Sequence, residues 1–299
     1  MNPFWLSHFT ATSCIGSGKT ATLAALQQRR GGLTRCAFDT VDLDTYIGEV
    51  PAVDAVQLPA HLGHFDCRNN RLALLGLMQD QFAEAVEATK AKYGAQRVGV
   101  FLGTSTAGIL QTELAYRRRH PDSGALPPDF IYRTTHNTYS VADFVRHYFD
   151  LRGPAVVVSS ACSSSAKVFG SARRMLEAGL IDAALVGGVD SLCLTTLYGF
   201  NSLGLTSDSA CRPFDAQRNG ISIGEAAAFA LLERVPQQLD ADAVLLLGTG
   251  ESSDAYHMSS PHPEGLGAQI AMREALDRAG LAPDDIDYIN LHGTATPSN

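Results

Sequence analysis

The sequence predicts an α/β protein in which helices cover a largely buried sheet. Short, valine-rich apolar stretches indicate strands, and they alternate along the chain with longer segments of helical periodicity. The strand-like stretches are apolar without alternation, which is typical of strands buried on both faces. The chain has 299 residues, of which 45% are hydrophobic and 18% charged, so it can enclose a sizeable core. Together these observations favour layers of helices packed on a sheet.

The first elements in chain order are two strands and a helix. Residues 97–103 (RVGVFLG) predict a short strand that ends at glycine, and residues 154–161 (PAVVVSSA) predict a second strand. Residues 163–180 are expected to form a helix, because their apolar side chains fall on one stripe and Arg173 and Arg174 lie largely opposite it.

The remaining elements continue the alternation. Strands or strand-rich segments are expected at residues 183–189, 220–233, 244–250 and 288–291. Before the last of these, Leu266–Ala279 predicts an amphipathic helix, and Gly280 is its expected C-cap.

A polar segment, residues 237–242 (QQLDAD), is the best internal boundary. It follows Pro236, and a strand is expected directly after it. It divides the sequence into a first unit, residues 1–236, and a second unit, residues 243–299. The second unit looks incomplete, because the sequence stops just after a strand and a loop.

The composition argues against several classes of protein. A net charge of −8 disfavours overall attraction to nucleic acid or to an anionic membrane. There is no apolar run of the roughly 18–20 residues that span a membrane, and residues 1–8 (MNPFWLSH) show neither the basic stretch nor the long apolar stretch of a signal peptide. The six cysteines are dispersed, and His257 and His262 have no partner at metal-ligand spacing. We therefore expect a cytoplasmic protein with no membrane span, no metal site and no nucleic-acid partner.

Residues 15–20 (IGSGKT) look like the end of a phosphate-binding loop. Such a loop needs an earlier glycine to wrap its N–H groups around phosphate, and Ser13 stands at that position. We interpret the segment as a tight turn that opens a helix near Thr20.

Cys162 stands at the expected corner between a strand and a helix, in the segment VVVSSACSSSA. The positive end of a helix favours a thiolate, and free N–H groups of a first turn can stabilise an oxyanion. Small neighbours leave room for an acyl chain. A buried cysteine that packs a helix start would show the same pattern, so the local sequence leaves both interpretations open.

Several stretches around Cys162 match one family in order. They are LRGP (151–154), SSACSSSAKV (159–168), FNSLGLTS (200–207), RPFD (212–215) with RNG (218–220), SSDAYHM (252–258) and HGTATP (292–297). Through them the sequence closely resembles the β-ketoacyl synthase family, more weakly before about residue 70. The resemblance implies a thiolase-like, layered α-β-α-β-α fold. Its nucleophile-bearing first half would be residues 1–236, and its second half, from residue 243, is incomplete in this chain.

The resemblance also implies a reaction. Cys162 would accept an acyl group from a carrier-protein or CoA thioester, with its own backbone N–H as one half of an oxyanion hole. His292 would donate a hydrogen bond to the thioester carbonyl of malonyl-carrier protein and stabilise the enolate that forms as carbon dioxide leaves. The product would be a β-ketoacyl chain of fatty acid, polyketide or polyene biosynthesis.

Supporting residues follow from the same resemblance. Thr294 and Thr296 would contact the pantetheine amides, and Asp254 would support the site from behind. Phe200 would line the acyl pocket, with plain core packing as the equal alternative. Ala295 departs from the family's HGTGTP glycine, which matters if that backbone needs a positive φ.

The expected partners are an acidic acyl carrier protein and a second synthase subunit. The family places a basic pair where Arg68 and Arg71 stand at helical spacing, so we expect these arginines to dock the carrier protein. Residues 117–119, the densest cationic run, are interpreted as solvated surface. A homodimer or a heterodimer with a related subunit is expected. Phosphopantetheine arrives on the carrier protein, so no cofactor of the chain's own is expected.

The sequence departs from the family after residue 299, where a lysine, a second catalytic histidine and a glycine-rich oxyanion loop should follow. We expect a fragment of a longer chain; a second polypeptide that supplies the missing half, or a shortened relative, are alternatives. The competing functions are a non-condensing partner subunit such as a chain-length factor, a carrier-protein-binding module, and a cysteine hydrolase that uses Cys162 and His292.

Overall fold

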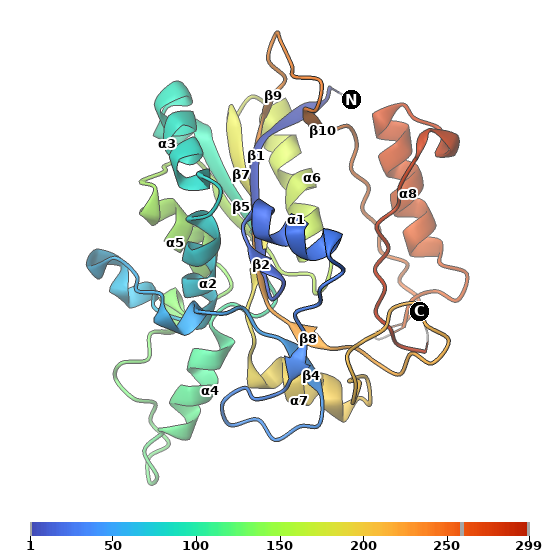
Figure 1. Ribbon diagram of the computed structural model, residues 1–299. Helices are drawn as coiled ribbons and strands as arrows, with labels where there is room; N and C mark the ends of the chain where they lie inside the picture. Colours follow the sequence, from blue (N-terminus) through green and yellow to red (C-terminus); the bar gives the residue numbers. More distant parts are fainter. Residues whose placement is uncertain (1, 258–259, 298–299) are drawn as a thin grey trace.

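The computed structural model describes residues 2–257 and 260–297 and is built around one mixed sheet (Figure 1). The strand order is β10-β1-β9-β7-β5-β6, and β2 pairs with β1. The strands are β1 Phe4–Ser13, β2 Gly16–Ser17, β5 Val98–Gly103, β6 Ala155–Val158, β7 Ala183–Asp190, β9 Ala226–Arg234 and β10 Val244–Leu246. A small second sheet contains β3 Thr34–Arg35, β4 Tyr46–Gly48 and β8 Ile223–Gly224.

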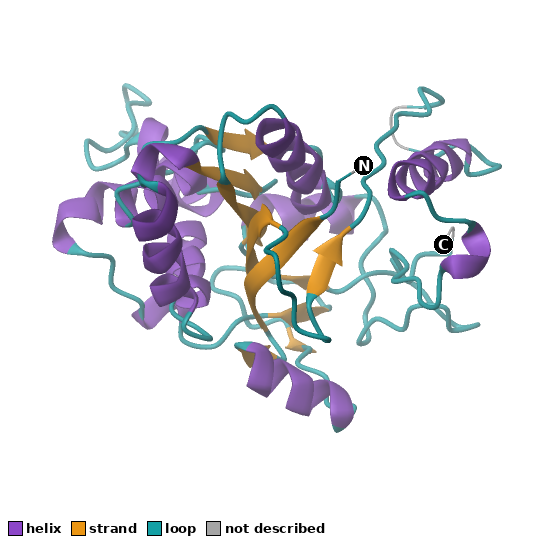
Figure 2. Cartoon of the chain, turned by 90° about the horizontal axis from the view of Figure 1, so that it is seen from above, coloured by secondary structure: helices purple, strands orange, loops and turns teal. Residues whose placement is uncertain are grey.

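Helices lie on both faces of the large sheet (Figures 1 and 2). They are α1 Lys19–Gln27, α2 Arg68–Leu77, α3 Phe82–Tyr93, α4 Ile109–Arg117, α5 Ser140–Tyr148, α6 Ser164–Glu177, α7 Leu194–Ser202 and α8 Leu266–Ala279. Helices α2, α3 and α5 cover one face, and their apolar residues share a core with the sheet. Helix α6 covers the other face through Val168, Ala172 and Leu176. Helix α8 lies beyond α6, on the side away from the large sheet. The described residues therefore show an α-β-α arrangement with α8 outside it, and the second sheet of the five-layer order is not among them.

Parallel strands place their carboxyl ends at one edge of the sheet. β5 pairs in parallel with both β6 and β7. The chain therefore leaves β5 at Gly103, β6 at Val158 and β7 at Asp190 on the same side, and this edge is where α/β sheets carry their sites.

The second unit differs from the prediction. The strand expected at residues 244–250 is shorter, and as β10 it pairs with β1 and so extends the first sheet. Residues 288–291 were expected to be a strand, but they form no ladder and their side chains are exposed, Tyr288 by 80%. A strand needs a neighbour for its N–H and C=O groups, and the described residues offer none there.

Helix α8 begins and ends where its periodicity predicts, and Gly280 adopts the left-handed conformation with φ 70°. It packs on an extended segment through Gly248 and Gly250, where a side-chain Cβ would overlap with the α8 backbone. Arg278 fixes the same segment by donating a hydrogen bond to the carbonyl of Thr249 at 2.7 Å.

Candidate active site

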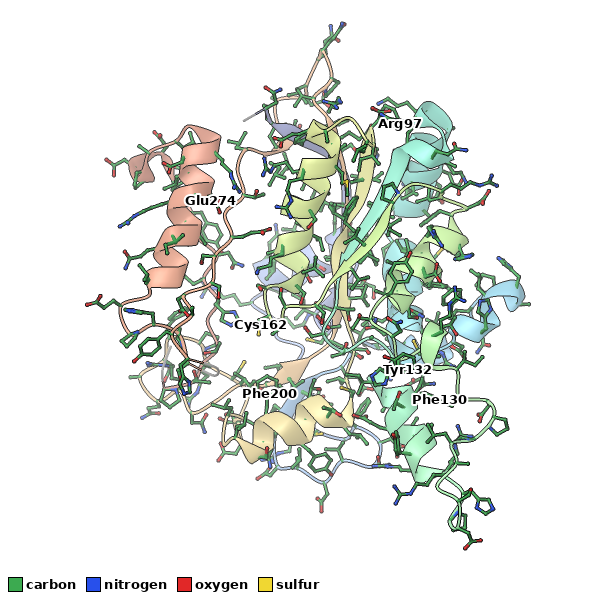
Figure 3. The ribbon with its side chains drawn as sticks, turned by 180° about the vertical axis from the view of Figure 1, so that it is seen from behind. Arg97, Phe130, Tyr132, Cys162, Phe200 and Glu274 are labelled. Atoms are coloured by element: carbon green, nitrogen blue, oxygen red, sulfur yellow. The ribbon has the colours of Figure 1, made fainter. Side chains whose placement is uncertain are left out.

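Cys162 lies at a sharp corner between β6 and α6. Ala161, directly before it, adopts a left-handed conformation with φ 53°, which non-glycine residues rarely do. The thiol of Cys162 is exposed, so the interpretation of a buried packing cysteine is wrong. Figure 3 shows Cys162 at the end of α6 that faces α7. Strained backbone that presents an exposed nucleophile is typical of an active site.

Serine hydroxyl groups hold this corner. Ser164 Oγ donates to the carbonyl of Ala161 at 2.6 Å and accepts the N–H of Ser160 at 2.9 Å. Ser163 Oγ donates to the carbonyl of Ser160 at 2.9 Å. These short side chains satisfy backbone groups that the corner takes out of the strand and the helix, which explains why serines surround the cysteine.

Two glycines let the first turn of α6 approach the sheet. A Cβ on Gly103 of β5 would overlap with the backbone of Ser164 and Ser165, and a Cβ on Gly188 of β7 would overlap with the side chain of Ser165. Helix α6, which follows Cys162, therefore packs directly on the backbone of β5 and β7 at these two glycines. This close packing fixes the position of the helix.

Ser105 and Asp190, which the sequence analysis did not select, belong to the same corner. Ser105 Oγ donates to the carbonyl of Ala161 at 3.1 Å, and the N–H of Ser105 donates to Asp190 Oδ1 at 2.7 Å. A signal was present, because both residues follow predicted strands at the carboxyl edge of a parallel sheet.

Phe200 lies on α7, near the end of α6 that carries Cys162 (Figure 3). Glu113 of α4 fixes the start of α7, because its carboxylate accepts the N–H groups of Leu194 at 2.9 Å and Thr195 at 2.7 Å. Phe200 itself is half-buried.

The predicted substrate segment around Thr294 and Thr296 is anchored on the RNG motif. The two threonine hydroxyls are 2.8 Å apart. Gly220 donates its N–H to the carbonyl of Ala295 at 2.9 Å, and Arg218 Nε donates to the carbonyl of Thr296 at 3.0 Å. Arg218 and Thr296, which are 78 positions apart in sequence, thus connect the two motifs into one structural unit.

Ala295 has φ 60°, so this backbone does need the positive φ that favours glycine. The methyl group is fully buried. The departure from glycine therefore stores backbone strain at the expected substrate-binding segment.

His292 is exposed, and no hydrogen bond within residues 2–257 and 260–297 joins it to Cys162. The hydrogen bonds thus define two local units: Cys162 with its serines, and Thr294 with Thr296. Asp254 organises its own loop by accepting the N–H of His262 at 2.9 Å and of Tyr256 at 3.2 Å. These N–H groups lower the pKa of the Asp254 carboxyl.

Arg68 is placed differently from the expectation. Its guanidinium is buried and donates to Glu225 at 2.9 and 2.7 Å, to Asp54 at 2.9 Å and to Glu49 at 3.1 Å. A buried arginine whose donors are occupied by three carboxylates is not available to an acidic partner, so this placement does not fit docking. Arg71 is more exposed and makes two hydrogen bonds with Asp66 at 2.6 Å.

A cavity of about 590 Å³ lies between α6 and α8, with Ser163 at its edge next to Cys162. Small residues line most of it, among them Gly248, Gly250 and Ala271. The acidic side chain in its wall, Glu251, lies 3.8 Å from Arg174. The cavity is therefore lined by residues of both units and reaches Ser163, the residue after Cys162.

Within the glycine-lysine segment, Gly16–Ser17 form the short strand β2, and the predicted turn into the helix is at Gly18. Helix α1 begins at Lys19, directly after Gly18 with φ 82°. The Asp80 carboxylate accepts the N–H of Lys19 at 2.9 and 3.1 Å. An anionic side chain of the protein therefore occupies the helix end where a phosphate would have to bind.

The described residues lack the features of two other classes of site. Residues 2–257 and 260–297 contain no group of three or more His, Cys, Asp or Glu side chains placed to hold a metal ion. In the same part of the chain, none of the helices has the length and apolar character needed to cross a membrane.

Two family models match the sequence. The model for "Beta-ketoacyl synthase, N-terminal domain" matches residues 73–238, and that for "Beta-ketoacyl synthase, C-terminal domain" matches residues 243–299. The 3-oxoacyl-(acyl-carrier-protein) synthase 2 of Rhizobium meliloti is 35% identical over 210 residues, which are 66% of this chain and 49% of the relative. Nodulation protein E of the same organism is 35% identical over 209 residues, 69% and 51% of the two chains. The chain spans about half the length of the curated relatives it matches.

Solved structures show the same fold. A ketosynthase (ApeO) in complex with its chain length factor (ApeC) from Xenorhabdus doucetiae has a TM-score of 0.87 and 36% identity, over 100% of this chain and 73% of that chain. A beta-ketoacyl synthase from Burkholderia phymatum has a TM-score of 0.83 and 27% identity, over 100% and 75%. The thiolase-like α/β fold expected from the motifs is confirmed.

Proposed function

Because the chain belongs to the β-ketoacyl synthase family, we propose that Cys162 carries the acyl group in a decarboxylative condensation. The observation that carries this proposal is the corner at Cys162, where a left-handed Ala161 presents an exposed thiol at the start of α6. The first turn of that helix brings backbone N–H groups to the developing oxyanion.

The proposed first step is transfer of an acyl group. The Cys162 thiolate attacks the thioester carbonyl, a C–S bond forms, and the pantetheine thiolate leaves and takes up a proton. In the second step a malonyl thioester loses carbon dioxide, and its enolate carbon attacks the acyl-Cys162 carbonyl. A C–C bond forms, the C–S bond breaks and the Cys162 thiolate is regenerated.

The other motif residues would serve the malonyl thioester. We assign to His292 the hydrogen bond that stabilises the enolate oxygen, and to Thr294 and Thr296 the amides of the phosphopantetheine arm that the carrier protein brings. Their half-buried hydroxyls, side by side at 2.8 Å, support this role. We assign the acyl-pocket wall to Phe200 and a supporting role for the 254–262 loop to Asp254.

The proposed partners are an acyl carrier protein and a second synthase subunit. Of the two arginines expected to dock the carrier protein, Arg71 remains a candidate because it is partly exposed. Strand β6 supports a dimer: it pairs with β5 on one side only, and its residues Ala155–Val158 are aliphatic and half-buried. The ketosynthase of X. doucetiae was solved with a chain length factor, which favours a heterodimer.

The pathway we propose is fatty acid or polyketide synthesis, since the relatives bear the names of a 3-oxoacyl synthase and a ketosynthase. A cytoplasmic location is proposed with it. All six cysteines are free, which suits a reducing compartment.

Mass spectrometry tests the acyl transfer. The complete protein is incubated with an acyl-carrier-protein thioester, and the modified peptide is identified. We expect one acyl group on Cys162, none in Cys162→Ala, and normal labelling in the matched variant Cys36→Ala. An unlabelled Cys162 would refute the proposal, and rapid release of free acid would favour the hydrolase.

A further inference from the structure

The Asp190 carboxylate holds the loop that follows β5. Its Oδ1 accepts the N–H groups of Ser105 at 2.7 Å and Thr106 at 3.1 Å, and the hydroxyls of Thr104 at 3.2 Å and Thr106 at 3.1 Å. Thr106 Oγ1 accepts the N–H of Ser191 at 2.9 Å in return. One carboxylate oxygen therefore fixes three successive residues, and bonds to a charged acceptor are stronger than neutral ones.

The fixed loop reaches the cysteine corner through Ser105. Its Oγ donates to the carbonyl of Ala161, which also accepts Ser164 Oγ at 2.6 Å and the N–H of Ser164 at 3.1 Å. Ala107, two residues beyond Ser105, has φ 42°, so the loop is strained like Ala161. Ser105 Oγ thus joins two adjacent loops that each contain a left-handed alanine, and such strain persists only where surrounding contacts fix it.

The Ala161–Cys162 peptide is planar and trans, so its C=O and N–H point in opposite directions. Fixing the carbonyl oxygen of Ala161 therefore fixes the direction of the Cys162 N–H. This N–H is the group that the proposed function uses to stabilise the oxyanion during acyl transfer. An oxyanion donor is effective only when it is aimed in advance.

We propose that Asp190 and Ser105 are positioning residues that aim the Cys162 N–H at the thioester oxygen, acting through the Ala161 carbonyl. This inference rests on the proposed acyl transfer. Neither residue touches the reacting atoms; Asp190 acts on Ser105, and Ser105 acts on the peptide.

Two reactions of the Cys162 thiol distinguish orientation of its backbone N–H from a general structural role of Ser105 and Asp190. Acylation by an acyl thioester develops an oxyanion, whereas alkylation by iodoacetamide displaces iodide and develops none. Both rates are measured at Cys162 in the complete protein and in the variants Ser105→Ala and Asp190→Asn. The matched control is Asp182→Asn, at the opposite end of β7, where the carboxylate pairs with Arg97 at 2.8 Å.

We expect Ser105→Ala to slow acylation by about tenfold or more and Asp190→Asn by about fivefold, since loss of a whole oxyanion donor costs about 10²–10³-fold. Alkylation should stay within about twofold in both, and Asp182→Asn should change neither rate. Acylation within twofold of the unaltered protein in Ser105→Ala, or equal losses in both reactions, would overturn the inference. If the unaltered protein is alkylated at Cys162 but never acylated, the proposed function itself fails.

Discussion

The guanidinium of Arg68 and the carboxylate of Glu225 form a buried two-point ion pair, with Nε–Oε2 at 2.9 Å and Nη2–Oε1 at 2.7 Å. Glu225 also accepts the N–H groups of Val50 and Leu192, both at 2.9 Å. The pair thus connects α2 to the end of β8 and to the loop that leads into α7.

Removing Arg68 leaves the Glu225 charge buried and unpaired. We expect Arg68→Met to lower the free energy of unfolding by about 3–5 kcal/mol. Arg71→Met is the matched control: it breaks the more exposed pair with Asp66 and should lower the same quantity by about 1 kcal/mol or less. Urea unfolding curves give both values. Similar losses in the two variants would contradict the interior role of Arg68.

Gly103 has no room for a side chain. A Cβ there would push into the first turn of α6, so Gly103→Ala should lower the free energy of unfolding by about 3 kcal/mol. Gly199→Ala is the contrasting control, because Gly199 lies in α7 with open space around it and alanine favours a helix by up to about 1 kcal/mol. Thermal unfolding should give a lower melting temperature for Gly103→Ala and a higher one for Gly199→Ala. A neutral Gly103→Ala would show that α6 does not rest on β5 as closely as described.

The buried Cys67 thiol is expected to make the free energy of unfolding fall at alkaline pH. Burial raises the pKa of its thiol to about 12, whereas an unfolded thiol titrates near 8.5. A raised folded pKa contributes stability that is fully present below the unfolded pKa and is lost as pH rises from about 8.5 toward 12. We expect this loss to reach about 2 kcal/mol at pH 10. Between pH 7 and 10, denaturant unfolding should therefore show a smaller loss of the free energy of unfolding for Cys67→Ala than for the unaltered protein. Equal losses in the two proteins would refute the contribution of Cys67.

Ala161 is strained in its left-handed conformation and its methyl group is exposed. Glycine removes about 1–2 kcal/mol of strain but adds about 0.5–1 kcal/mol of unfolded-state entropy. Ala161→Gly should therefore raise the free energy of unfolding by up to about 1 kcal/mol. Ala88→Gly, at an exposed position inside α3, should lower it by about 1 kcal/mol. A loss in both variants would show that Ala161 is not strained.

The sequence predicted well those helices and strands whose pattern lies within one short segment. The helix Leu266–Ala279 and its Gly280 cap follow from periodicity and one glycine. The strands β5 and β7 lie within one residue of their expected bounds, because continuous apolar runs bounded by turns specify buried strands. The position of Cys162 at a strand-to-helix corner follows from the same kind of signal.

Contacts between distant residues could not be predicted in this way. The sequence shows that Arg68 and Arg71 share a helix, but not that Glu225, 157 residues later, folds back to pair with Arg68. Nor does it show that β10 joins β1, or that Ser105 reaches the carbonyl of Ala161 across 56 residues. These contacts depend on which strands become neighbours in the sheet, and the strand order cannot be read from a single sequence.

The open side of β6 has a consequence for how the protein must be made. Among residues 2–257 and 260–297, β6 pairs only with β5, so one edge of its four aliphatic residues can template cross-β growth between nascent chains. Ala155–Val158 contain no charged side chain or proline that would block it. A chain whose β6 edge stays uncovered is therefore expected to aggregate into inclusion bodies. If the second subunit proposed above covers β6, co-expression with it should raise the yield of soluble protein.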